Sequence, residues 1–242
     1  MTLSDWLLFA FCAMLSGMSK TGVAGIYYLT VPIMAAIFGG KVSTGVLLPI
    51  LNIADFFAVW YYKRSANWTY IIRLVPVAFL GVILGTWVGN MISEEGFKLI
   101  MGIVVLFGIG VMVFMDLRKT TDVPDYWWFS LLTGLISGFS TMVGNAAGSV
   151  LAVYLLSMRL PKDVYIGTTA WFFLIINLTK VPFHVFVWKT ITWNSFLMGM
   201  AMIPVVGLGA VLGIWIVRQI PDKYYRGFVL VVTAASAIFL LL

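Results

Sequence analysis

The stretch that decides the fold lies in the middle of the first apolar block and reads Ser16-Gly17-Met18-Ser19-Lys20-Thr21-Gly22-Val23-Ala24-Gly25. Apolar residues flank this stretch on both sides, and the whole block runs from about residue 6 to residue 38. One continuous helix of that length would be roughly 50 Å long, whereas the hydrocarbon core of a membrane is about 30 Å thick. Small and polar residues at the centre of an overlong apolar block therefore predict two shorter helices joined by a break.

A second block, from about residue 127 to residue 158, has the same construction. Its centre reads Ser137-Gly138-Phe139-Ser140-Thr141-Met142-Val143-Gly144-Asn145-Ala146-Ala147-Gly148-Ser149. We expect each of the two long blocks to form a helical hairpin or a re-entrant pair.

Composition places the remaining blocks in a membrane as well. The chain has 242 residues, of which 62% are hydrophobic and 10% are charged, against about 25% charged in soluble domains. The apolar blocks run at about 6–38, 44–62, 70–92, 97–115, 127–158, 164–188, 193–217 and 224–242. This pattern predicts an all-α, polytopic transmembrane bundle with eight hydrophobic segments and eight to ten helices, because lipid cannot satisfy an open backbone. It excludes a separate soluble catalytic or nucleic-acid-binding domain.

The basic residues test the hairpins, because Lys and Arg concentrate in cytoplasmic loops. If every block crossed once, thirteen basic residues of the connections would divide six against seven. If the two long blocks go in and return, three remain on the N-terminal side, namely Lys41, Lys98 and Lys189. The other ten gather opposite: Lys63, Arg64, Arg73, Arg118, Lys119, Arg159, Lys162, Arg218, Lys223 and Arg226. We therefore expect a multi-pass protein of the cell inner membrane with both termini on the outer, periplasmic side.

The two halves of the chain resemble each other at spacings of about 121 to 128 residues. Ser16–Ser19 matches Ser137–Ser140. Further matches pair Thr44 with Thr169, Asn52 with Asn177, Trp68 with Trp193, Pro76 with Pro204, and Leu84-Gly85-Thr86-Trp87 with Leu212-Gly213-Ile214-Trp215. Each half then has one broken hairpin and three single crossings, so the halves enter the membrane from opposite sides. Such an inverted repeat with broken helices is typical of secondary transporters. We expect one transporter domain over residues 1–242, with repeats at about 1–116 and 127–242 and a linker at about 117–126. The glycines at 81, 85, 89, 209 and 213 are interpreted as helix-packing residues.

Four ionisable residues lie within apolar blocks: Lys20, Asp55, Lys180 and His184. Each would cost about 2.5 to 3.5 kcal/mol if unpaired at the centre of a helix, so each should face the protein interior or a watery cavity. Two lysines in such an interior favour an anionic substrate. The alternative for Lys20 is an internal ion pair with Asp55, which still leaves Lys180 uncompensated. As carriers of a coupled proton, Asp55 and His184 are the candidates, although His184 is also explained as an ordinary interfacial histidine.

The breaks supply the other parts of an anion site. Half-helices that start there would point free backbone N–H groups and positive dipole ends inward. The expected substrate-binding residues are Ser19, Lys20, Thr21, Gly22, Gly25, Asn52, Ser140, Thr141, Gly144, Asn145, Gly148, Asn177 and Lys180. No catalytic residue, metal site or cofactor is expected.

The run Gly17-x-x-Lys20-Thr21-Gly22-x-x-Gly25, its Gly/Asn-rich counterpart at 138–148, the two similar halves and the length resemble the TauE/SafE family of sulfite and organosulfonate exporters. The resemblance covers essentially the whole chain, but the second motif has no lysine at the place of Lys20. It implies a bacterial-type inner-membrane carrier for sulfite, sulfoacetate or similar sulfonates, working by alternating access. The residues by themselves indicate only a small anion.

Other readings of the same residues remain. An anion channel or an uptake permease would use the same donors. An intramembrane hydrolase with Ser140 as nucleophile and His184 as base is disfavoured, because no glycine follows the serine two residues later. A membrane scaffold would leave the buried lysines unexplained. A homodimer stays open, and nucleic acid is not expected as a partner.

Overall fold

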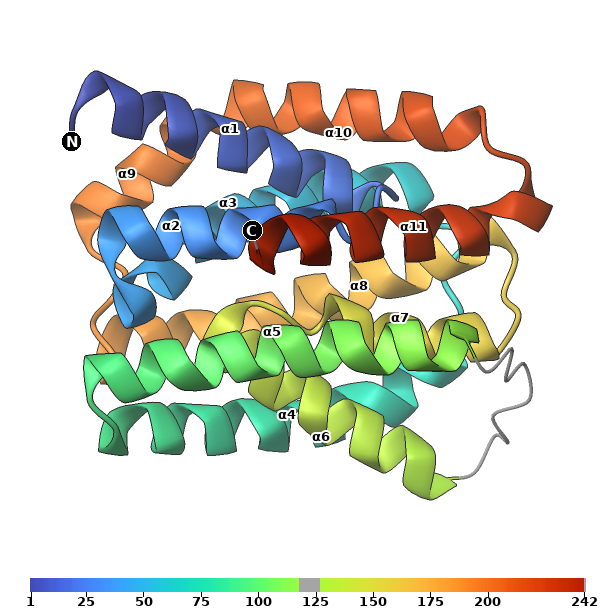
Figure 1. Cartoon of the computed structure of the whole chain (residues 1–242), viewed down its shortest axis with the longest axis horizontal. Coiled ribbons are helices and arrows are strands. Elements are labelled where there is room, and N and C mark those ends of the chain that lie inside the picture. The colour runs from blue at the N-terminus through green and yellow to red at the C-terminus, as the bar shows by residue number, and fades with distance from the viewer. Residues whose placement is uncertain (118–126, 242) are drawn as a thin grey trace.

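The computed structural model describes residues 1–117 and 127–241, and every regular element in these two ranges is helical (Figure 1). The elements are α1 (Leu3–Lys20), η1 (Ile26–Leu29), α2 (Thr30–Phe38), α3 (Gly40–Tyr62), α4 (Trp68–Met91), α5 (Glu94–Leu117), α6 (Trp127–Gly144), α7 (Gly148–Ser157), α8 (Lys162–Pro182), η2 (Phe183–Val187), α9 (Trp193–Ala201), α10 (Ile203–Arg218) and α11 (Asp222–Leu241). The prediction of an all-α protein is confirmed. The expected linker, with Arg118 and Lys119, lies outside the described residues apart from Leu117.

Both overlong blocks divide where the sequence predicts. The first changes direction after Lys20 and the second after Gly144. In each case the second helix returns towards the end of the molecule from which the first one came (Figure 1). The two breaks meet in the interior of the bundle.

A third division, in the block at 193–217, was not expected. Helices α9 and α10 meet at Met202 with a bend of 47°. Pro204 stands at the start of α10, where its missing N–H cannot bond the preceding turn. Its match Pro76 lies inside the unbroken α4, so proline permits the bend without forcing it. This division gives eleven α-helices in the described residues, one more than the upper limit of the prediction.

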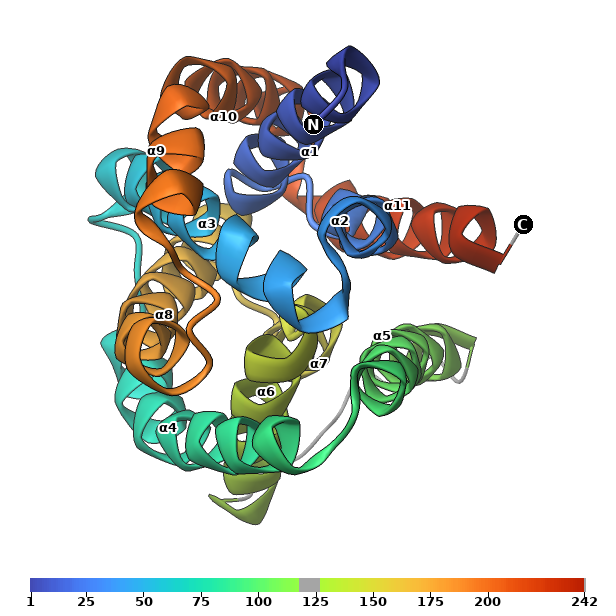
Figure 2. The same ribbon diagram turned by 90° about the vertical axis from the view of Figure 1, so that its left-hand side faces the viewer.

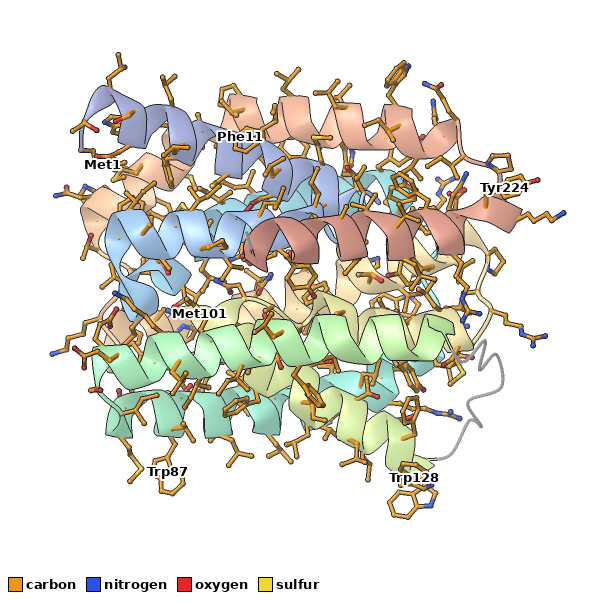
Figure 3. The ribbon with its side chains drawn as sticks, in the orientation of Figure 1. Met1, Phe11, Trp87, Met101, Trp128 and Tyr224 are labelled. Carbon is orange, nitrogen blue, oxygen red and sulfur yellow. The ribbon has the colours of Figure 1, made fainter. Side chains whose placement is uncertain are left out.

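The outside of the bundle is apolar. Phe11, Trp87 and Trp128 point away from it (Figure 3), and many other large hydrophobic side chains are exposed in the same way. Within the described part of the chain, three helices are long and apolar enough to cross a membrane: Gly40–Tyr62, Trp68–Met91 and Lys162–Val187. The bent pair Trp193–Ala201 and Ile203–Arg218 makes a fourth if it is one span.

Glycines bring the helices into close contact at two interfaces, α1 against α10 and α4 against α6. A Cβ atom on Gly17 would collide with the Val206 carbonyl, and one on Gly209 with the Met14 carbonyl. At the other interface Gly138 lies against Ala78, and Gly81 against the Leu135 carbonyl. At Gly213 a Cβ would collide with the Thr21 hydroxyl, and at Gly89 with the Trp188 ring. At Gly85 it would lie 2.9 Å from the Met142 side chain. The prediction that the glycines at 81, 85, 89, 209 and 213 serve helix packing is confirmed.

Helix α3 lies in the interior of the bundle and packs on α8 (Figure 2). Burial covers 72% of the apolar stretch of α3, but 39% of that of α4 and of α8. The connections after α3, α7 and α10 lie at one end of the molecule, and those after α2, α4 and α8 lie at the other end with the N-terminus (Figure 1).

Candidate functional site

The first break is built on two glycines. The chain leaves α1 at Thr21 and then takes positive φ angles at Gly22 (124°) and Gly25 (96°), a region that side chains with a Cβ rarely adopt. Helix η1 begins directly after Gly25. The peptide groups between these glycines therefore belong to no helix and face the interior.

The second break is closed by an asparagine. Asn145 has φ of 53°, in the left-handed region that Asn tolerates better than most residues. The Asn145 N–H donates to the Thr141 carbonyl at 3.0 Å, which is the bond of the αL capping motif, and the Ala146 N–H donates to the Ser140 carbonyl at 3.2 Å. The turn fixes the position of the Asn145 side chain, which points to the centre of the protein.

A cavity of about 60 Å³, measured as space open to the centre of a water molecule, lies between the two breaks, α8 and α11. A buried water needs roughly 10 to 15 Å³ on this measure, so the cavity holds a few waters or a small ion. Seven of the residues expected from the sequence line it: Ser19, Lys20, Gly25, Thr141, Asn145, Gly148 and Asn177. The structure thus brings together parts of both breaks with the middle of α8.

Lys20 is paired with a carboxylate. Its Nζ atom lies 2.9 Å from Oδ1 of Asp55 and 3.9 Å from the centre of the Phe173 ring. The Asp55 side chain is fully buried, whereas that of Lys20 keeps 11% of its surface exposed. Lys20 and Asp55 therefore form the internal ion pair that was the alternative interpretation of Lys20, and Lys20 lines the cavity.

Lys180 is fully buried behind the cavity wall and is held by neutral oxygens. Its Nζ atom donates to Oδ1 of Asn145 at 2.6 Å, to Oδ1 of Asn177 at 3.1 Å and to Oγ1 of Thr141 at 3.2 Å. No ion pair of Lys180 occurs among the described residues. When Lys20, Asp55 and Lys180 are all ionised, this centre carries one net positive charge.

Asn177 joins the two lysines into one network. Its Nδ2 atom donates to Oδ2 of Asp55 at 2.6 Å, while its Oδ1 atom accepts from Lys180. Hydrogen bonds therefore run without interruption from Lys20 through Asp55 and Asn177 to Lys180 and Asn145. A group that displaces one member must rearrange the others.

Five of the expected binding residues lie away from the cavity. Thr21 uses its hydroxyl for the carbonyls of Gly17 and Ala210, at 2.9 and 3.1 Å, and the Gly22 carbonyl accepts from the hydroxyl of Tyr225. These two residues hold the break against α10 and α11. Ser140 is buried within α6 beside the break, and Gly144 lies against Met101 of α5.

Asn52 departs furthest from expectation. Its Nδ2 atom donates to the carbonyl of Leu48 in its own helix, at 3.0 Å. The side chain faces an apolar groove between α3, α8 and the bent pair α9 and α10, and its buried Oδ1 atom has no hydrogen-bond partner among the described residues. Asn177 therefore reaches the network and its match Asn52 does not.

His184 is buried within the protein. Its Nδ1 atom is 2.8 Å from Oγ1 of Thr190, and its ring packs edge-on against Trp188 at 5.0 Å. It stands in the π-helical turn η2 and does not line the cavity.

Sequence reasoning missed the tyrosines of the cavity wall, Tyr27, Tyr28 and Tyr165. The Tyr28 hydroxyl accepts from the backbone N–H of Ser149 at 2.6 Å and so ties the two breaks together. Tyr27 is 8% exposed, and its hydroxyl lacks a hydrogen-bond partner within the described ranges. The pair Tyr27-Tyr28, directly after the glycines of the first break, was the available signal.

Comparison with known proteins identifies one family. A family model described as "Sulfite exporter TauE/SafE" matches residues 8–240, which include both breaks and every residue of the network. No match was found among curated proteins or among solved structures. The chain therefore belongs to the sulfite exporter TauE/SafE family, and with its apolar helices it is a multi-pass membrane transporter of small sulfur-containing anions.

Proposed function

We propose that the protein exports sulfite or a small organosulfonate such as sulfoacetate by alternating access, and that the anion binds in the cavity between the two breaks. The observation that carries this proposal is one hydrogen-bonded network, in which Lys20, Asn145 and Asn177 line the cavity and Asp55 and Lys180 lie behind its wall. One net positive charge in a dry interior favours a bound anion, because charges interact more strongly there than in water.

The donors that meet the anion come from both breaks. Lys20 and Ser19 end α1, Asn145 and Thr141 end α6, and the unpartnered Tyr27 hydroxyl adds a further donor. Gly25 and Gly148 let an anion approach the backbone. These groups replace several waters of a small oxyanion at once. No residue of this set is arranged as a nucleophile with a base, which disfavours the hydrolase alternative.

We propose further that the two halves form inverted repeats about this cavity. Equivalent contacts support it: Gly17 contacts Val206, and Gly138 contacts Ala78. Gly138 follows Gly17 by 121 residues, and Val206 follows Ala78 by 128 residues. The Lys20–Asp55 pair corresponds to the Thr141–Lys180 hydrogen bond, at spacings of 121 and 125 residues. Repeats at about 1–116 and 127–242 then form one transporter domain.

The charge distribution supports an orientation in the inner membrane with both termini on the periplasmic side. Eight of the ten basic residues assigned to the cytoplasm belong to connections, or to the adjoining helix ends, at one end of the molecule. The other two, Arg118 and Lys119, lie outside the described residues. Single-cysteine labelling at positions 64 and 160 tests this orientation. Labelling of both from the cytoplasm is expected, and labelling from opposite sides contradicts the hairpins.

Asp55 is the better of the two proton-coupling candidates. It belongs to the network and changes partner if an anion takes Lys20, whereas His184 is held by Thr190 outside the cavity wall. A dianion would bring the centre to one net negative charge, and a proton on Asp55 would restore neutrality.

Flux of radiolabelled sulfite or sulfoacetate in proteoliposomes tests the site. The parent protein is expected to saturate with substrate and to turn over slowly, whereas an open channel conducts far faster. Lys20→Ala and Asn145→Ala are expected to lose most of the flux, while Lys63→Ala, an exposed lysine at a connection, keeps it. Unchanged flux in both cavity variants would contradict the assignment. Opposite substrate gradients across oriented vesicles distinguish export from uptake.

A further inference from the structure

The unpaired amide of Asn52 is the feature that the proposed function leaves unexplained. A buried carbonyl without a hydrogen bond is unfavourable, and a polar side chain in an apolar groove of a membrane protein is more so. Its match Asn177 uses both ends of its amide, to Asp55 at 2.6 Å and from Lys180 at 3.1 Å. In the described residues the Asn52 Oδ1 atom accepts nothing.

The positions of the charged residues follow the same spacing. Asn52 precedes Asp55 by three residues, as Asn177 precedes Lys180, and both pairs are separated by 125 residues. Asn177 reaches across from α8 to Asp55 on α3. The equivalent contact in the other half would run from Asn52 on α3 to Lys180 on α8. The chemistry suits it, because the free atom of Asn52 is an acceptor and the Lys180 ammonium is a donor.

The halves differ in shape as well as in this contact. The last span before α11 is bent by 47° at Met202, whereas α4, its counterpart, is unbroken. The groove that encloses Asn52 is bounded by this bent pair. When two inverted repeats have different conformations, each repeat can adopt the conformation of the other. That exchange gives the state that opens to the other side of the membrane.

We propose that Asn52 is a positioning residue for transport, whose Oδ1 atom accepts a hydrogen bond from Lys180 in the opposite-facing state. This inference rests on the proposed function. In the present state Asn145 and Asn177 hold Lys180; in the other state Asn52 takes it and Asn177 releases Asp55. Asn52 therefore stabilises the second state without contacting the anion in the first.

Replacement of Asn52 by alanine separates this role from a structural one. Asn52→Ala removes an unpaired carbonyl, so its thermal stability should equal or exceed that of the parent. The apparent affinity for sulfite, measured by thermal stabilisation, should stay within about twofold of that of the parent. Sulfite flux should fall by about fivefold or more, which is the lower range of allosteric coupling. A residue needed only for the fold would lower stability and flux together. Asn90→Ala, at an exposed position of α4, is the matched control.

Replacement of Asn52 by aspartate should increase the population of the opposite-facing state, because a carboxylate at position 52 would hold the Lys180 ammonium in that state. A single cysteine at position 148 reports this in a Cys12→Ala background. A Cβ at Gly148 would meet only the Tyr28 hydroxyl, at 3.5 Å, so the cysteine fits the cavity wall. Asn52→Asp should change the ratio of its labelling from the two sides of the membrane by about fivefold or more. Asn90→Asp should not.

Two results would overturn the inference: flux of Asn52→Ala equal to that of the parent, or the same labelling ratio in Asn52→Asp and in the parent. Failure of the proposed function has a different signature. In that case the parent itself shows neither sulfite flux nor stabilisation by sulfite.

Discussion

The hydroxyl of Tyr28 accepts a 2.6 Å hydrogen bond from the backbone N–H of Ser149, so the start of the helical segment after one break is capped by a side chain from the other break. The two residues are 121 residues apart, the spacing at which Ser16–Ser19 matches Ser137–Ser140. Under the proposed repeat, the contact joins equivalent places in the two halves, beside the cavity.

Removal of this hydroxyl should leave a buried N–H at the start of α7 without its partner. Tyr28→Phe is expected to destabilise the protein by about 1 to 3 kcal/mol. The measurement is thermal unfolding in detergent, followed by tryptophan fluorescence. Tyr224→Phe, on an exposed tyrosine at the periphery (Figure 3), should leave the transition unchanged. Equal transitions in both variants would show that water replaces the hydroxyl.

The Lys20–Asp55 pair should behave as two coupled charges. Removing one partner of a buried ion pair typically costs about 3 to 5 kcal/mol, because the other charge stays buried and alone. Asp55→Asn and Lys20→Met are therefore each expected to lower the unfolding temperature. The double variant should recover most of the loss and yet fail to bind sulfite. A double variant less stable than either single one would mean that the two side chains do not compensate each other.

The left-handed backbone of Asn145 separates two effects of its replacement. Asn145→Gly and Asn145→Ala both lose the hydrogen bond to Lys180, but only alanine also resists φ of 53°. We expect the glycine variant to be more stable than the alanine variant by about 1 kcal/mol, at the low end of the cost of a left-handed residue. Thermal unfolding of the two variants side by side measures the difference, and the reverse order would contradict it.

The cavity offers one position where its size alone can be changed. The Cβ of a Gly148→Ala variant would touch only the Tyr28 hydroxyl, so the fold should be retained. A methyl group removes a substantial part of a space of about 60 Å³. Stabilisation by sulfoacetate is therefore expected to weaken more than stabilisation by sulfite. Parallel titrations of both anions check this, and an equal response would place the anion elsewhere.

The glycine interfaces give a prediction about stability without a change at the cavity. A Cβ at Gly138 would collide with the Ala78 carbonyl, whereas one at Gly102 would meet nothing within 4 Å. Overpacking of this kind costs about 1 to 3 kcal/mol. Gly138→Ala should thus lower the unfolding temperature, and Gly102→Ala should not. If both variants unfold with the parent, α4 and α6 have room to separate.

The two breaks could be predicted because their cause is local. A membrane limits helix length, and Gly22, Gly25 and Asn145 stand where the chain must leave the helix. The grouping of Lys20, Asn145, Asn177 and Lys180 also followed, since each is a polar residue that lipid does not accept. For residues in a bilayer, length and polarity are strong constraints.

Other features depended on contacts between distant residues. Asn52 and Asn177 look equivalent in the sequence, but only one turns to the network, because the helices around them differ. Pro76 and Pro204 match equally well, and only Pro204 accompanies a bend. Tyr28 was overlooked because a tyrosine in an apolar run shows no partner until Ser149 is placed beside it.

The packing of α1 against α10 has a consequence for how the protein is made. The Thr21 hydroxyl donates to the Ala210 carbonyl across a sequence separation of 189 residues, and the glycine face of α1 has α10 as its main partner. A ribosome that adds residues in order delivers α1 to the membrane long before α10 exists. Until α10 is made, this face of α1 must contact lipid or an assembly factor. A chain truncated before α10 should therefore lack the packing partner of its first hairpin and be degraded by membrane proteases.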